Sequence, residues 1–289
     1  MYFRSDMAKE VRDRYMKEYS VRHKGEPDGI RYTEKRCGKI DLSEIEIFNG
    51  AGEKALSRPR GRYVTVNAGK IWQTDGETFY NCADVIADVI NSMRKSKDGC
   101  VLAAGLGNRY VTADALGPLS VKRVIATHHI RDMEVYKDSG FGDCAVISPG
   151  VLSQTGIEAA EQIRAAVTVI KPSLVIIIDA LAAAAIETLS VSVQITDTGV
   201  SPGSGVGNDR GELSEKTLGA PVVAVGVPTV IDAASLVRDI TDEDCKRLKG
   251  MYVCPKDSDR SVYELSRLIG CAVNRVCHSD ISYNDMEYI

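Results

Sequence analysis

Two aspartates stand where strands of an α/β sheet would end. Asp179 directly follows the apolar run 174–178, and Asp114 comes shortly after a second apolar run, 100–104. Apolar runs without alternation are typical of parallel strands covered on both faces, and open α/β sheets bind their ligands at the carboxyl ends of such strands. Two carboxylates in one crevice can share a proton, activate a water and protonate a leaving amine. We therefore take Asp114 and Asp179 as candidate catalytic residues; the alternative for each is a helix cap.

Glycine-rich turns follow the elements that carry these acids. Their backbone N–H groups can form an anion nest or an oxyanion hole, although a tight structural turn is the equal alternative. A Gly-x-Gly pair without a third glycine is a weak signal for a phosphate loop, and Ser204 lacks the elbow pattern of a nucleophilic serine. The candidate residues of a substrate or oxyanion loop are Gly105, Gly107, Asn108, Gly203, Ser204 and Gly205.

The elements that must position these residues alternate between strands and helices. Apolar runs predict buried strands at 100–104, 174–178 and 222–227. Shorter alternating stretches predict further strands at 45–47 and 62–66. Apolar spacing of three and four predicts a helix at 82–95, and an amphipathic pattern predicts one at 258–278. Further helices are expected at 7–19, 156–170 and 230–237. The glycine-rich, charged segment 23–38 predicts a loop. This order predicts an α/β fold, a three-layer αβα sandwich with a mostly parallel central sheet.

The composition is ordinary for a globular protein of the cytosol. The chain has 289 residues, 44% of them hydrophobic, and a formal net charge of −4. Without a basic block, direct nucleic-acid binding is disfavoured. No apolar run approaches the roughly 20 residues of a membrane span, and the charged first residues do not resemble a signal peptide. We expect a cytoplasmic protein that contacts no membrane and needs no cofactor.

The cysteines and histidines form no metal-ligand pattern. The eight cysteines contain no Cys-x-x-Cys pair, so free thiols are expected in a reducing compartment. The pair Cys277-His278 has no second pair to complete a site. Adjacent residues such as His128 and His129 point apart on a helix or strand. We therefore expect no bound metal.

Several longer motifs, in this order, resemble the germination protease family of spore-forming bacteria. The similar stretches are residues 105–108, 111–118, 149–152, 155–158, 178–183, 202–208, 217–219 and 226–233, with a weaker match at 252–256. They contain the sequences Gly-Leu-Gly-Asn, Val-Thr-Ala-Asp-Ala-Leu-Gly-Pro and Ile-Asp-Ala-Leu-Ala-Ala, and the likeness covers most of residues 1–240. Motifs of this length in the same order are far more specific than a lone glycine pattern.

The resemblance implies an atypical aspartic endopeptidase that starts the breakdown of small acid-soluble spore proteins in the spore core. The two aspartates proposed as catalytic in the family fall on Asp114 and Asp179. The resemblance also implies a fold similar to the hydrogenase-maturation peptidases, synthesis as a zymogen, and a homotetramer. The family is processed between an acid and an apolar residue followed by Ala, which corresponds to Asp6-Met7-Ala8. Residues 1–6 are then a propeptide and residues 7–289 a single peptidase domain.

The chain departs from the family at several charged positions. A basic residue usually follows the two alanines after the second aspartate, but residues 182–185 are all alanine. A family Lys corresponds to Asp209, a family His to Ser201, and an Arg-His pair to His128-His129. We expect these changes to lie near the cleft. Because an acidic residue before the cut bond needs a positive partner, we also expect an altered substrate affinity or pH optimum.

Two other functions stay open on this sequence. A metal-dependent maturation-type peptidase could use the same fold, with Asp114 and Asp179 as ligands of a cation. A non-catalytic chain could bind spore proteins without cutting them, which only the missing basic residues favour. Retention of both aspartates and of the Asp6-Met7-Ala8 sequence argues against this last function.

Overall fold

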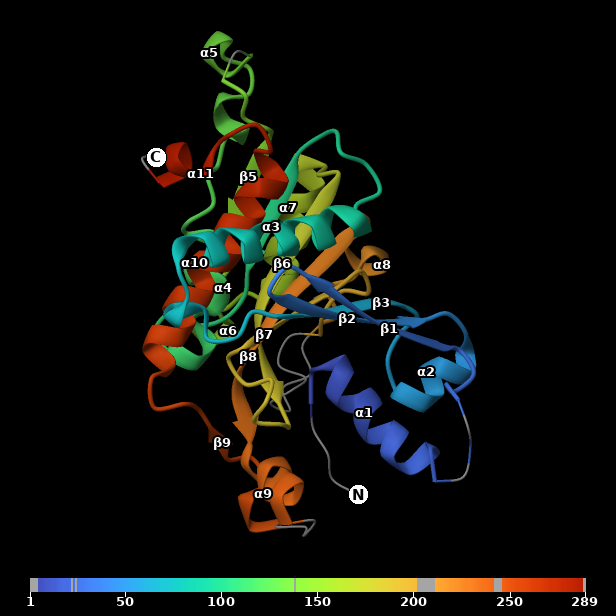
Figure 1. Ribbon diagram of the computed structural model, residues 1–289. Helices are drawn as coiled ribbons and strands as arrows, with labels where there is room; N and C mark the ends of the chain where they lie inside the picture. Colours follow the sequence, from blue (N-terminus) through green and yellow to red (C-terminus); the bar gives the residue numbers. More distant parts are fainter. Residues whose placement is uncertain are drawn as a thin grey trace.

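A single mixed sheet forms the centre of the protein. The structure is a computed structural model that describes residues 5–21, 23, 25–137, 139–201, 211–241 and 246–287. The described strands form a nine-stranded sheet in the order β1-β2-β3-β7-β8-β6-β4-β5, with β9 paired to the end of β8 (Figure 1). Their bounds are β1 Ile30–Cys37, β2 Ile40–Ile47, β3 Gly61–Asn67, β4 Val101–Gly105, β5 Cys144–Ile147, β6 Leu174–Ala183, β7 Ser192–Thr196, β8 Val222–Asp232 and β9 Tyr252–Val253.

The sheet has a parallel half and an antiparallel half. Strands β8, β6, β4 and β5 run parallel to one another. The apolar runs predicted β4, β6 and β8, whereas β5 was not predicted. Strands β1, β2, β3 and β7 pair antiparallel, and β7 joins the two halves through β8. The predicted α/β class is confirmed, but the sheet is mixed, because the N-terminal third of the chain adds hairpin strands to one edge.

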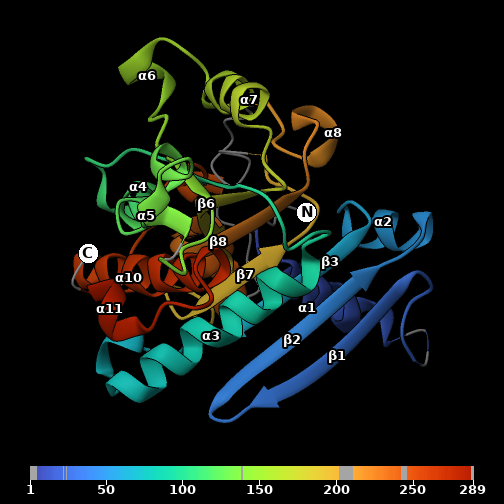
Figure 2. The same ribbon diagram turned by 90° about the horizontal axis from the view of Figure 1, so that it is seen from above.

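Helices cover both faces of this sheet. The helices are α1 Ala8–Tyr19, α2 Gly50–Leu56, α3 Gly76–Met93, α4 Leu116–Val121, α5 Glu134–Lys137, α6 Leu152–Thr155, α7 Ala159–Ile170, α8 Glu215–Leu218, α9 Ala233–Thr241, α10 Ser258–Cys277 and α11 Tyr283–Glu287. Figure 2 shows α3 and α10 on one face and α7 on the other. Among the described helices, none is long and apolar enough to cross a membrane.

The sheet has a hydrophobic core on each face, and successive side chains of β6 point alternately into one and the other. Ile176 and Ile178 pack into the cluster that contains α3, α4 and α10. Val175 and Ile177 pack on the opposite face, in the cluster that contains α7. Since both faces of the strand are apolar and buried, its sequence reads as a continuous run. The strand is therefore held between two helical layers, which fixes the position of Asp179 directly after these residues.

Two predicted segments differ from the structure. Residues 30–37 of the expected loop 23–38 form strand β1, which pairs along its whole length with β2 through a tight turn that has Gly38 at a φ of 61°. The alanines after Asp179 continue β6 as a strand, and Ala183 is still paired with Ile231 of β8. In both segments, pairing with a neighbouring strand overrides the local preference for a loop or a helix.

The end of α10 fixes the connection between α4 and β5. The Asn274 side chain donates to the Arg123 carbonyl and accepts the Ile125 N–H, both at 2.9 Å. One nitrogen of His278 bonds the Ile125 carbonyl at 2.9 Å, and the other accepts the Gly142 N–H at 3.2 Å. This pattern requires a neutral imidazole, and burial lowers the pKa of His278 below its ordinary value.

Candidate active site

One row of residues crosses three adjacent strands where the parallel and antiparallel halves of the sheet meet. Asp179 of β6 is in register with Gly226 of β8, and Gly226 is in register with Gln194 of β7. Residues directly opposite each other in a sheet point their side chains to the same face. Asp179 and Gln194 therefore project to one side, separated by a residue without a side chain. Asp179 is only 8% exposed, and Gln194 is 6% exposed.

Asp114 reaches the same cleft from the loop after β4. It ends a short 3₁₀ turn, Thr112–Asp114, and its carboxylate accepts the Asn108 N–H at 2.8 Å. Gly107 has a φ of 111°, and a Cβ atom there would lie 2.8 Å from Oδ1 of Asp114 and collide with its backbone carbonyl. Gly107 thus allows the loop to fold back against Asp114. The hydroxyl of Thr229 holds the other side of the turn through the Ala113 carbonyl at 2.5 Å.

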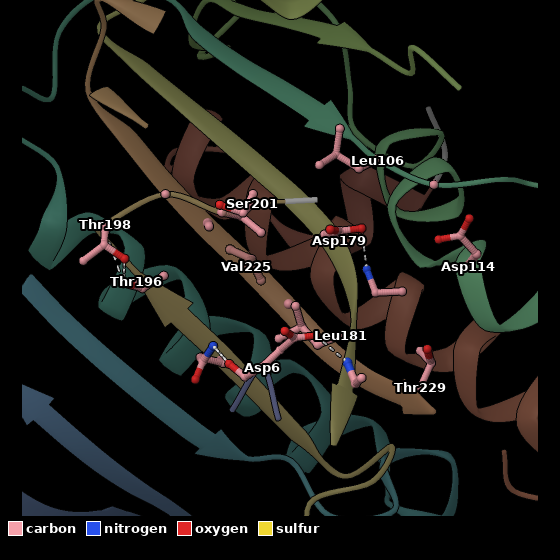
Figure 3. Close-up of a pocket in the computed structure, with 18 of the residues that line it drawn as sticks. Asp6, Leu106, Asp114, Asp179, Leu181, Thr196, Thr198, Ser201, Val225 and Thr229 are labelled. Carbon is pink, nitrogen blue, oxygen red and sulfur yellow. Dashed lines mark hydrogen bonds between the residues drawn. The ribbon is translucent and has the colours of Figure 1, made fainter. Parts of the chain in front are cut away.

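Asp114 and Asp179 line one cleft of about 570 Å³, beyond the carboxyl end of β4 and beside the second half of β6. Figure 3 shows both aspartates, together with Asp6 and Leu181, around this space. The location agrees with the rule that open α/β sheets place their sites at the carboxyl ends of parallel strands.

The N-terminal segment runs along this cleft and pairs with the end of β6. The Asp6 N–H donates to the Ala182 carbonyl, and the Asp6 carboxylate accepts the Ala182 N–H, both at 2.8 Å. Arg58, which also lines the cleft, donates to the Ser5 carbonyl at 2.7 Å. A backbone N–H therefore binds the carboxylate of Asp6.

Gln194 contacts the peptide groups on both sides of Met7. Its Nε2 donates to the Asp6 carbonyl at 3.0 Å, and its Oε1 accepts the Ala8 N–H at 2.6 Å. The Met7 residue between them is 0% exposed. The sequence Asp6-Met7-Ala8 is thus held in a defined register against the sheet.

Glu10 anchors the first turn of α1 to the loop after β6. Its buried carboxylate accepts the N–H groups of Ala184 and Ala185 at 2.7 and 3.3 Å and the hydroxyl of Thr188. The Ser5 hydroxyl donates to the same carboxylate. Burial raises the pKa of Glu10 above its ordinary value, although these hydrogen bonds oppose the rise.

Comparison with known proteins identifies the family. A sequence model described as germination protease matches residues 6–249. The chain belongs to the germination protease family. It is 40% identical to the germination protease of Clostridium tetani over 283 residues, which are 95% of this chain and 86% of that protein. It is 38% identical to the germination protease of Clostridium acetobutylicum, over 92% of this chain and 80% of that protein. It is 41% identical to that of Caldanaerobacter subterraneus, over 85% of this chain and 74% of that protein.

Membership of the germination protease family supports a peptidase activity and gives the cleft its context. Four of the residues predicted from the sequence line the cleft: Asp6, Gly107, Asp114 and Asp179. Gly105 packs against the backbone of Gly117 at the end of β4. Gly203, Ser204 and Gly205 lie outside the residues that the structure describes.

The sequence did not single out Gln194, Ala182 or Arg58 as site residues. Gln194 gave no local signal, because polar and apolar residues alternate along β7. Ala182 gave none either, because it acts through its backbone. Of the altered family positions, Ser201 lines the cleft and Asp209 lies outside the described residues.

Three residues near the starts of β4 and β5, at the opposite end of the strands from the cleft, have the types that bind metals. One ligand atom each of Cys100, His128 and Asp143 lies within 4.8 Å of the others. These residues precede or flank the starts of β4 and β5, so His128 is not near the cleft, contrary to expectation. Asp143 and His128 already bond each other at 2.7 Å, and burial raises the pKa of Cys100 to about 12. The thiol is therefore protonated at neutral pH.

Proposed function

We propose that this chain is an endopeptidase that initiates the degradation of small acid-soluble spore proteins during germination, with Asp114 and Asp179 activating the attacking water. The observation that carries the proposal is the sequence Asp6-Met7-Ala8 bound along the cleft that both aspartates line. This segment has the acid, apolar and small residues expected around the cut bond. Family membership supports the same activity.

The proposed reaction needs one proton donor and one acceptor. Two neighbouring carboxylates favour a state with one proton between them, so one acts as base and the other as acid. The base removes a proton from water while the water oxygen adds to the peptide carbonyl carbon. The carbon–nitrogen bond then breaks, and the leaving nitrogen takes up a proton from the carboxylate pair. The products are a free carboxyl group and a free amine, which balances the addition of one water.

A backbone N–H contributes to recognition of the acid before the cut bond. The Ala182 N–H bonds the Asp6 carboxylate, and hydrogen bonds to charged groups are stronger than those between neutral groups. The same residue's carbonyl accepts the Asp6 N–H, so backbone and side chain are bound together. We propose that an acidic residue of a substrate occupies this position in the same way.

The same proposal includes the remaining features that the family implies. Residues 1–6 act as a propeptide that is removed by a cut between Asp6 and Met7, and the intact chain is a zymogen. The mature protein assembles as a homotetramer in the forespore and spore core. The fold is related to that of the hydrogenase-maturation peptidases, which the helices on both faces of the sheet favour.

Two single substitutions test the proposed chemistry. Asp114→Asn and Asp179→Asn each preserve shape but cannot share a proton, so each should abolish cleavage of an acid-soluble spore protein. The assay is gel electrophoresis and mass spectrometry of the fragments, with circular dichroism as the control for folding. Near-normal cleavage by either folded variant would disprove the aspartate pair.

A chelator separates the two enzymatic mechanisms. Cleavage that persists in a strong chelator supports the aspartate pair. Cleavage that stops and returns with added metal supports a cation held by the same two aspartates. A wild-type chain that binds the spore protein without cutting it would support the non-catalytic function.

A further inference from the structure

Charge also has to be stabilised on the oxygen of the bond that is cut. Addition of water turns the peptide carbonyl oxygen into an oxyanion, which hydrolytic sites stabilise with hydrogen-bond donors already in place. A protonated carboxyl of the proposed pair can donate to this oxygen, but it gives up that proton to the leaving nitrogen later in the reaction. The described part of the cleft contains a different donor at the Asp6 carbonyl, the side-chain amide of Gln194.

We propose that Gln194 is a catalytic residue that binds the peptide on both sides of the residue after the cut bond. Its Nε2–H group stabilises the oxyanion, and its Oε1 fixes the N–H of the second residue after the cut. This inference rests on the proposed function, because it takes Asp6-Met7-Ala8 as a substrate-like segment. It extends that function by naming the group that holds the reacting carbonyl.

The orientation of the Gln194 amide follows from its partners. The Ala8 N–H can only donate, so the atom that faces it must be the amide oxygen. The Asp6 carbonyl can only accept, so the amide nitrogen must face it. The two contacts therefore support each other, and a flipped amide would lose both.

The position of Gln194 in the sheet supports a role beyond packing. The row Asp179, Gly226 and Gln194 places one proposed catalytic carboxylate and the amide on the same face, two strands apart. Neighbouring strands lie about 4.8 Å apart, so these two backbone positions are separated by roughly 10 Å. Both side chains therefore face the same side of the sheet, and the side chain of Leu181 fills the space over Gly226.

Burial keeps the amide in this position before a reaction begins. Gln194 is almost fully buried, and both of its polar atoms are paired with residues 6–8. A donor that needs no rearrangement stabilises a developing charge more effectively than a mobile one. Loss of a single donor of this kind lowers the rate of hydrolysis by roughly 100- to 1,000-fold.

The test uses self-cleavage of the intact chain between Asp6 and Met7. Gln194→Met keeps the volume but removes both hydrogen bonds, and should lower the rate constant of self-cleavage by roughly 100- to 1,000-fold. Thr65→Val is the matched control, because Thr65 is buried and in register with Gln194 on β3. Thr65→Val should cut itself at close to the wild-type rate. Equal rates for wild type and Gln194→Met would overturn the proposal.

A charged variant separates oxyanion stabilisation from packing. Gln194→Glu keeps an acceptor for the Ala8 N–H, but its carboxylate repels an oxyanion until it is protonated. The ratio of its self-cleavage rate to the wild-type rate should therefore rise as the pH falls. A ratio that is independent of pH would contradict the donor role, because a purely structural defect has no reason to follow this protonation.

Hydrogen exchange distinguishes failure of this inference from failure of the proposed function. In the intact chain, Gln194→Met should speed exchange of the Ala8 amide by about tenfold, as expected for loss of one hydrogen bond. Unchanged exchange would overturn the contact itself. Faster exchange in a chain whose wild type never cuts would refute both the proposed function and the catalytic role, and leave Gln194 as a binding contact only.

Discussion

Gly107 offers a direct test of how the loop after β4 positions Asp114. The substitution Gly107→Ala adds one carbon where the backbone has a φ of 111° and where Asp114 is in contact. An L-residue rarely adopts this conformation, which costs about 1–3 kcal/mol. Overpacking against Asp114 costs a further 1–3 kcal/mol or so. The sum, roughly 2–6 kcal/mol, is a large part of the 5–15 kcal/mol by which typical domains are stable.

The chain can avoid this cost only by moving the Asp114 turn. A shift of about 1 Å in a catalytic group lowers rates by about 100-fold. We therefore expect Gly107→Ala to lose stability, activity or both, as measured by urea unfolding and by the rate of cleavage of an acid-soluble spore protein.

Gly219→Ala is the matched control for this experiment. Gly219 also has a positive φ, 72°, but a Cβ atom there would meet no atom within 4 Å. It should cost about 1 kcal/mol and leave cleavage unchanged. The reasoning is refuted if Gly107→Ala cuts at the wild-type rate and is no less stable than Gly219→Ala.

Three further predictions concern stability. Asn274→Ala leaves two buried backbone groups of residues 123–125 without partners and should lower the free energy of unfolding by about 2–4 kcal/mol in urea titrations; a loss under 0.5 kcal/mol or so would contradict this. The lowered pKa of His278 means that the unfolded chain binds the proton more readily, so stability should fall as the pH drops below about 6.5, and less steeply in His278→Gln. The raised pKa of Glu10 has the opposite effect on stability. The folded chain binds this proton more readily than the unfolded chain, so the contribution of Glu10 to stability should decline as the pH rises above about 4.5. Urea midpoints measured across pH for Glu10→Gln should lack this decline, and parallel curves for variant and wild type would contradict it.

The sequence predicted the buried strands best. β4, β8 and the first half of β6 are apolar on both faces, and that pattern depends only on local sequence. β1 was missed because most of its residues are exposed and only its pairing with β2 makes it a strand. The end of β6 was missed as a strand because alanine favours a helix, whereas its pairing with β8 decides the outcome.

The candidate site was predictable where it depends on side chains at strand ends. Asp114 and Asp179 stood out because a carboxylate after an apolar run is easily recognised. Gln194 depends on a register across three strands, one of them antiparallel, which no local pattern encodes. Ala182 acts through its N–H and carbonyl, so its side chain gives no indication of its role.

Anchoring of α1 by Glu10 has a consequence for any free substrate. Residues 5–8 are joined directly to that helix, so they meet the cleft as a tethered ligand, and short tethers give effective concentrations in the millimolar range. A peptide in solution has to compete with this local concentration, however well it fits the same groups. The intact chain should therefore bind micromolar substrate weakly. The cut after Asp6 releases residues 1–6, and with them this competition for the cleft.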